Sequence, residues 1–111
     1  MSSLTLQVPA VKALKVTVTE DALTVDLSDG RTVSAPLAWY PRLLHATDAE
    51  RSNWRLIADG EGIHWPDLDE DLSVESIVLG RPSGESQSSL KRWFGSRQRR
   101  AKTRGVRTPK Q

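Results

Sequence analysis

The sequence predicts an α+β domain: a small antiparallel sheet with short helices packed on it, followed by a basic C-terminal helix or disordered tail. Three observations lead to this fold class. Short segments in which apolar and polar residues alternate indicate strands. Turn residues such as Ser28-Asp29-Gly30 separate these segments, and helix-start residues lie between two groups of them. The expected order is β-β-β-α-β-β-α over residues 1–80.

Three strands are expected first. Leu14, Val16 and Val18 alternate with polar residues, which is typical of a half-buried strand. The second strand runs through Leu23–Leu27 and the third through Thr32–Leu37. Short turns join them, so the three strands form an antiparallel meander.

The turn between the second and third strands decides which side chains share a face. A two-residue loop would set Val33 opposite Asp26 and mix the apolar and polar faces. A three-residue loop, Ser28–Gly30, instead pairs Val25 with Val33 and keeps one face apolar. It also puts Gly30 at the left-handed position that such a loop requires. We therefore predict the three-residue loop.

Capping residues predict two short helices, or one bent helix, over residues 40–53. Pro41 suits a first helical turn, because its φ is already helical and its missing N–H is not needed there. Thr47 and Glu50 have the spacing of a capping box. Each helix start is thus indicated by its own local signal.

A second hairpin and a final helix complete the expected domain. Residues 54–58 and 63–66 have strand character and flank an Asp-Gly-Glu-Gly turn. Ser73 suits the N-cap of a short helix. Gly80, followed by Arg-Pro, ends that helix.

The charge divides the chain into two parts. Residues 1–84 carry seven Lys/Arg against thirteen Asp/Glu, a net charge of −6. Residues 85–111 carry nine Lys/Arg against Glu85 alone, a net charge of +8. Parts of opposite charge are expected to bind different partners.

Composition places the boundaries between these parts. We expect an acidic α+β domain over residues 1–80, a flexible Ser-rich linker over 81–89, and a basic tail, partly helical or disordered, over 90–111. Leu90, Trp93 and Phe94 have the spacing of one helix face within the tail.

Several functional classes find no support in the sequence. There is no cysteine, hence no disulfide framework or thiolate chemistry. Met1–Ala10 lacks the features of a signal peptide, and no apolar run is long enough to span a bilayer. The sequence contains neither the phosphate-binding motif G-x-x-x-x-G-K-[ST] nor the dinucleotide-binding motif G-x-G-x-x-G. We expect a soluble, cytoplasmic protein without a cofactor.

Three motifs resemble a known family. The domain is similar to the bacterial family catalogued as domain of unknown function 2442, over residues 8–80. The motifs are Leu27-Ser28-Asp29-Gly30, Tyr40-Pro41-x-Leu43 and, most specifically, Trp65-Pro66-Asp67-x-Asp69-x-Asp71-Leu72-Ser73. The resemblance implies a small α+β domain, sometimes joined to a DNA-binding helix-turn-helix, and often encoded beside another small protein in what look like toxin–antitoxin pairs. It implies no catalytic residues, and the basic tail lies outside it.

Asp67, Asp69 and Asp71 occupy the alternate positions at which a calcium loop begins. Such a loop needs Gly at its sixth position and Glu at its twelfth, where this chain has leucine and valine. We expect the aspartates to bond backbone N–H groups in a turn and at the following helix start. The alternative is a metal-dependent hydrolase that uses these aspartates with His64.

The remaining histidine and tryptophan positions have ordinary structural interpretations. His64 alternates with Ile63 and Trp65, so it is expected to face solvent, with a His–carboxylate pair as the alternative. Trp39, Trp54 and Trp65 are expected to belong to the core rather than to a ligand cage, with Trp39 the most exposed.

The basic tail carries the functional prediction. Lys and Arg neutralise phosphates, and an aromatic side chain can stack on a base. The alternatives are contact with the acidic domain of the same chain or a protein partner and, less favoured, an anionic membrane. The expected nucleic-acid-binding residues are Lys91, Arg92, Trp93, Arg97, Arg99, Arg100, Lys102, Arg104 and Arg107.

These observations favour a non-enzymatic binding or regulatory module, antitoxin-like in organisation. The acidic domain would bind a protein partner, such as a small basic toxin-like protein, and the tail would bind nucleic acid. The alternative is a small accessory subunit of a nucleoprotein assembly, with its tail threaded into RNA or DNA. A free sheet edge would also allow a homodimer.

Overall fold

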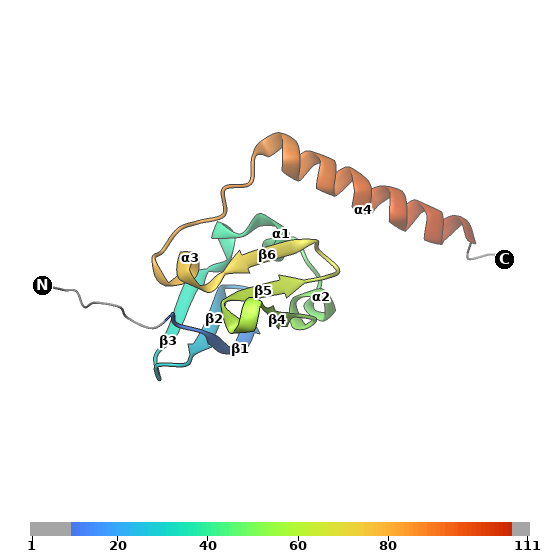
Figure 1. The fold of residues 1–111 in the computed structure, drawn as a ribbon. Helices are drawn as coiled ribbons and strands as arrows, with labels where there is room; N and C mark the ends of the chain where they lie inside the picture. Colours follow the sequence, from blue (N-terminus) through green and yellow to red (C-terminus); the bar gives the residue numbers. More distant parts are fainter. Residues whose placement is uncertain (1–9, 108–111) are drawn as a thin grey trace, which may run out of the picture.

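The domain contains two three-stranded antiparallel sheets, and a long C-terminal helix lies on it (Figure 1). The computed structural model describes residues 10–107, with side chains described as far as Arg99. The α+β class predicted from the sequence is confirmed. The strands form two sheets rather than the expected single one, because the second hairpin pairs with a sixth strand and not with the first three.

The first sheet has the order β1-β2-β3 and confirms the predicted meander. Its strands are β1 (Ala13–Val18), β2 (Ala22–Leu27) and β3 (Thr32–Pro36). Val25 pairs with Val33 as the three-residue loop requires. Gly30 has a φ of +95°, which a residue with a side chain adopts only at a cost.

The first strand departs from the simple alternation predicted for it. Ala13 pairs with Leu27 whereas Lys15 pairs with Asp26, so Leu14 is the extra residue of a β-bulge. Consequently Leu14 is 62% exposed and Ala13 faces the core in its place, whereas Val16 is buried as its alternation predicted. The prediction that Leu14 faces the core is wrong, because simple alternation cannot reveal a bulge.

The second sheet has the order β4-β5-β6. The predicted hairpin corresponds to β4 (Arg55–Ile57) and β5 (Gly62–Trp65), joined through the 3₁₀ turn η2 (Ala58–Gly60). The unpredicted strand is β6 (Glu70–Ser73), which pairs with β5. Acidic residues have low strand propensity, so this segment lacks the usual sequence signal of a strand.

Short helices connect and cover the sheets. They are η1 (Leu37–Trp39), α1 (Pro41–Leu44), α2 (Asp48–Ser52) and α3 (Val74–Val78). The predicted capping box begins α2, and Ser73 caps α3 through the backbone N–H of Ser76 at 3.0 Å. A Schellman arrangement around Gly80 ends α3, with the Arg81 N–H donating to the Ser76 carbonyl at 2.9 Å.

The core gathers apolar side chains from both sheets and from the helices. Trp65 is fully buried, and its indole N–H donates to the Arg51 carbonyl at 3.1 Å, whereas Trp39 and Trp54 are half-buried against the core. The other fully enclosed side chains are Tyr40, Leu23, Leu37, Leu43, Ile63, Leu68, Val25 and Val74.

The C-terminal helix is α4 (Gln87–Arg107), which begins three residues before the expected start of the tail at residue 90. In Figure 1 it lies on the side of the domain that carries α1 and β6, and its C-terminal part runs out past the domain. No helix within residues 10–107 combines the length and the apolar character needed to cross a bilayer.

Candidate nucleic-acid interface

The basic helix is held against the acidic domain by Trp93. This side chain is only 7% exposed, and its indole N–H donates to the Leu68 carbonyl in the turn between β5 and β6 at 3.1 Å. Leu90 and Phe94 pack beside it, as their helical spacing with Trp93 suggested. The ring that was expected to stack on a base is thus covered by the domain in this structure.

Two guanidinium groups lie close to the indole of Trp93. The Cζ atom of Arg97 is 4.6 Å from the ring centroid, and that of Arg42 is 5.5 Å away. Both distances lie within the range of cation–π attraction. The rings of His45 and Phe94 also pack in a T-shaped arrangement, with their centroids 4.9 Å apart. The contact surface of α4 is therefore aromatic and cationic rather than purely aliphatic.

Arg97 joins α4 to the capping box of α2. Its two terminal nitrogens donate to the two carboxylate oxygens of Glu50 at 3.0 and 3.1 Å. The same carboxylate accepts the N–H of Thr47 at 2.9 Å. Hydrogen bonds from Arg97 above all hold the pKa of Glu50 below its usual value. The Glu50 carboxylate thus takes part in the capping box of α2 and also anchors α4.

Arg42 makes the corresponding link to the start of α4. Its Nε and Nη2 atoms donate to the Glu85 carboxylate at 3.0 and 2.7 Å. Its Nη1 atom donates to the carbonyls of Leu68 and Asp69, both at 3.0 Å. This pairing lowers the pKa of Glu85 and raises that of Arg42. The arginine therefore connects α1, the β5–β6 turn and the residues before α4.

The segment between the domain and α4 is tied down at several points. Besides the Glu85 pair, the N–H of Ser83 donates to the Trp39 carbonyl at 3.0 Å, and the Ser89 hydroxyl donates to Glu85 at 2.9 Å. Residues 81–86, expected to belong to a flexible linker, are thus held to the domain. The first half of α4 contacts the acidic domain of its own chain, as one of the alternatives for the tail anticipated.

The predicted nucleic-acid-binding residues divide into three groups. Trp93 and Arg97 serve the docking of α4. Lys91, Arg92 and Arg99 are exposed along the docked part of the helix. The last group lies in α4, but its side chains fall outside the described ones: Arg100, Lys102, Arg104 and Arg107.

The aspartate segment is a hairpin whose acidic side chains have separate neighbours. Asp67 accepts a hydrogen bond from the side-chain amide of Asn53 at 2.9 Å. Asp71 lies opposite His64 on the neighbouring strand, and their side chains are hydrogen-bonded. Asp69 takes a left-handed turn conformation with a φ of +51°. The expectation that Asp67 and Asp71 bond backbone N–H groups is wrong, because both bond side chains instead.

The alternative of a metal-dependent hydrolase needs these aspartates and His64 to converge. Among the residues that the structure describes, no group of three or more His, Asp or Glu side chains is arranged to hold a metal ion. The structure brings together only His64 and Asp71 of the predicted set, as the His–carboxylate alternative anticipated.

One carboxylate that the sequence analysis missed is Glu70 on β6. It pairs with Trp65 across the hairpin, and burial raises its pKa to about 7, against the opposing effect of Arg42. The nearby charges of Glu85, Asp71 and Asp69 raise it further. An inward-pointing charge on an edge strand also discourages pairing with other chains.

The fold and the docked helix define a small α+β domain with a cationic helical extension. A family model matches residues 13–83, and the chain belongs to that family, described as protein of unknown function DUF2442. The predicted resemblance is confirmed, and α4 lies outside it. No curated protein matches the chain.

Two solved structures share this fold. A protein of unknown function from Rhodospirillum rubrum is 26% identical, with a TM-score of 0.59 over 69% of this chain and 95% of that one. An uncharacterised protein from Chromobacterium violaceum is 19% identical, with a TM-score of 0.57 over 66% of this chain and 69% of that one. The first relative is matched over almost all of its length.

Proposed function

We propose that this protein is a non-enzymatic binding module in which α4 contacts the phosphates of a nucleic acid and the acidic domain carries the helix and binds a protein partner. The supporting observation is the docking of α4 through Trp93 and Arg97. This docking uses one face of the helix and leaves Lys91 and Arg92 exposed. The basic sequence continues into the part of α4 that runs past the domain.

The chemistry favours contact with the nucleic-acid backbone. Lys and Arg side chains bind phosphates and release condensed counterions, which makes the affinity strongly dependent on salt. A helix that is already folded and anchored loses less conformational entropy on binding than a disordered tail. Because the Trp93 side chain is buried between α4 and the domain, the proposed binding does not use it for base stacking. The expected binding is therefore tolerant of sequence.

The biological setting is part of the same proposal. A cytoplasmic, antitoxin-like or regulatory module would use such a helix on DNA, and an accessory subunit of a nucleoprotein assembly would use it on RNA or DNA. Both roles need the exposed cations of α4. Native co-purification distinguishes them, because the first yields one small protein partner and the second a larger assembly with its nucleic acid.

The test is a salt titration of nucleic-acid binding. Fluorescence anisotropy with a labelled DNA duplex of about 20 base pairs gives the slope of log affinity against log salt. Replacement of both Lys91 and Arg92 by glutamine should reduce the magnitude of this slope by about 2, since each lost phosphate contact removes about 0.9.

A matched control removes the same charge from the domain. Lys15 and Arg55 are exposed on β1 and β4, and their joint replacement by glutamine changes the net charge equally. The slope measured for the control variant should differ by less than about 0.5 from that of the natural protein. Equal losses in both double variants, or no binding at about 50 mM salt, would overturn the proposal.

A further inference from the structure

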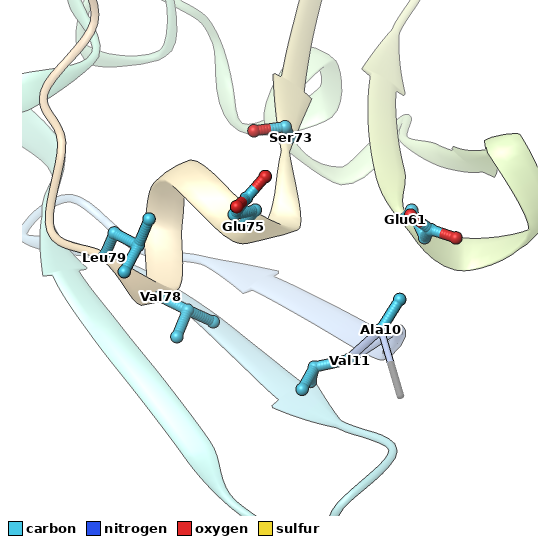
Figure 2. A pocket seen from close by; sticks show the side chains of 7 residues that line it. All are labelled: Ala10, Val11, Glu61, Ser73, Glu75, Val78 and Leu79. Atoms are coloured by element: carbon cyan, nitrogen blue, oxygen red, sulfur yellow. The ribbon is translucent and has the colours of Figure 1, made fainter. Parts of the chain in front are cut away.

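A groove of about 360 Å³ lies between α3 and the segment that leads into β1, and α4 contributes no residue to it. Figure 2 shows the end of α3 on one side and the start of the first strand on the other. The residues that line it are Ala10, Val11, Glu61, Ser73, Glu75, Val78 and Leu79.

The groove presents an apolar surface that the fold itself does not use. Leu79 is 55% exposed although it is a large apolar residue, and Val78 and Val11 are half-buried beside the same space. The hydrogen bonds that end α3 are made by the backbone, so they do not require a leucine at this position. Apolar side chains left exposed together commonly mark a binding surface.

Two carboxylates lie among these apolar side chains. Glu61 and Glu75 are both exposed, and neither is in an ion pair with another residue of the described chain. The hydrogen bond that Lys12 donates to Asp59, above all, and the negative charge of Glu61 in addition raise the pKa of Lys12. Because Lys12 is already bonded to Asp59 at 2.6 Å, the groove keeps its negative charge.

Backbone hydrogen bonds fix both walls of the groove. The N–H of Val74, at the start of α3, donates to the Glu61 carbonyl at 2.9 Å. On the opposite wall, the Lys12 N–H donates to the Ser28 hydroxyl at 3.0 Å, and the Ser28 N–H donates to the Lys12 carbonyl at 2.8 Å. A surface held in this way needs little reorganisation to bind a ligand.

We propose that this groove binds a basic segment of a partner protein. An apolar side chain of that segment lies between Val11 and Leu79, and Lys or Arg residues on either side of it pair with Glu61 and Glu75. Charge complementarity selects this occupant, because residues 1–84 carry a net charge of −6. The same charge disfavours the domain of a second copy, and the two carboxylates disfavour phosphate groups.

The inference deepens the protein-partner half of the proposed function and rests on it. Its test uses the full chain and a synthetic peptide, Gly-Lys-Arg-Leu-Lys-Arg-Gly, with amide chemical shifts as the readout. We expect shifts that saturate and map to α3 and to the start of β1. A peptide with Ser in place of Leu should bind about tenfold more weakly, and one with Glu in place of the four cations should not bind.

Variants of the protein test the apolar surface of the groove and its two carboxylates separately. Leu79→Ser should weaken peptide binding about tenfold, whereas Leu14→Ser, an equally exposed leucine on the β1 bulge, should not change it. The pair Glu61→Gln and Glu75→Gln should weaken binding and reduce its salt dependence. The control pair Glu20→Gln and Asp21→Asn removes two exposed charges from the β1–β2 turn. It should leave the peptide affinity and its salt dependence unchanged.

Other occupants of the groove would overturn the proposal. Self-association in sedimentation experiments that Leu79→Ser abolishes would identify a second copy as the occupant. A large gain in peptide affinity on removing residues 1–9 would identify the chain's own N-terminal segment. Absence of peptide binding, with nucleic-acid binding intact, would reject the groove and leave the role proposed for α4 standing.

Discussion

The guanidinium of Arg97 lies 4.6 Å from the ring centroid of Trp93 and at the same time grips the carboxylate of Glu50. Trp93 and Arg97 are four residues apart, so they are neighbours on one face of α4. Glu50 belongs to the capping box of α2. The helix that carries the positive charge is therefore attached to the acidic domain through a hydrophobic anchor and an ion pair on adjacent turns.

Replacing Trp93 by alanine should destabilise the protein by about 3–5 kcal/mol, because it removes a buried aromatic side chain and its bond to the Leu68 carbonyl. Urea unfolding measures this change. Trp54→Ala is the control, because Trp54 is only half-buried and its replacement should lower the free energy of unfolding by less. A change below about 0.5 kcal/mol would mean that α4 is not docked in solution.

The pair formed by Glu50 and Arg97 should have a measurable coupling energy. Glu50→Gln keeps an oxygen that can cap α2 but removes the charge, and Arg97→Gln removes the partner. A double-mutant cycle should give about 1 kcal/mol, since both side chains are partly shielded from solvent. The control is Asp48→Asn combined with Arg97→Gln, in which the two side chains do not touch and should show additive effects.

Acidification below about pH 4.5 should loosen α4. The pKa values of Glu50 and Glu85 are lowered in the folded protein, so their contribution is present above the unfolded value and is lost as pH falls through the folded one. The protection factors of the amides in residues 87–97, which allow for the slower intrinsic exchange in acid, should fall below that pH. The variant Glu85→Gln, which mimics the protonated carboxyl, should lower protection in α4 already at neutral pH. If it does so while acidification leaves the protection of α4 in the natural protein unchanged, protonation of these carboxylates does not loosen the helix.

Glu70 should act in the opposite direction at higher pH. Its folded pKa is raised to about 7, so the stability that it contributes is present below its unfolded value and is lost as pH rises through about 7. Glu70→Gln should therefore stabilise the protein at pH 8 by up to about 3 kcal/mol and have little effect at pH 4. Equal effects at the two pH values would show that Glu70 does not titrate in this range.

Gly30→Ala should destabilise the protein by about 1 kcal/mol, because alanine must then adopt a positive φ. Space is not the reason, since an added Cβ atom meets nothing within 4 Å. Gly84 also has free space and lacks a positive φ, so Gly84→Ala is the matched control and should cost nothing. Thermal unfolding of both variants checks this.

Most of the local structure could be predicted from the sequence. The capping box at Thr47, the cap at Ser73 and the stop at Gly80 depend on residues within one helical turn of one another. The register of β2 with β3 followed from the need to keep Val25 and Val33 on one face. These features have causes that are close together in the chain.

The errors have causes that are distant in the chain. Leu14 was misplaced because a bulge depends on pairing with β2, and β6 was missed because its acidic residues form a strand only when β5 is there to pair with them. The burial of the Trp93 side chain depends on distant residues in the same way. Its spacing with Phe94 indicates an apolar helix face but not the surface that covers it.

The sequence by itself determined the family, the α+β class, the helix ends and the division of charge between domain and tail, since motifs, caps and charges can be read from neighbouring residues. Only the tertiary structure decided that α4 docks on the acidic domain, that Arg42 and Arg97 both lie near the Trp93 ring, and that burial raises the pKa of Glu70. The physical reason is that burial, a shifted pKa and a cation–π contact are each created by residues that meet only when the chain has folded.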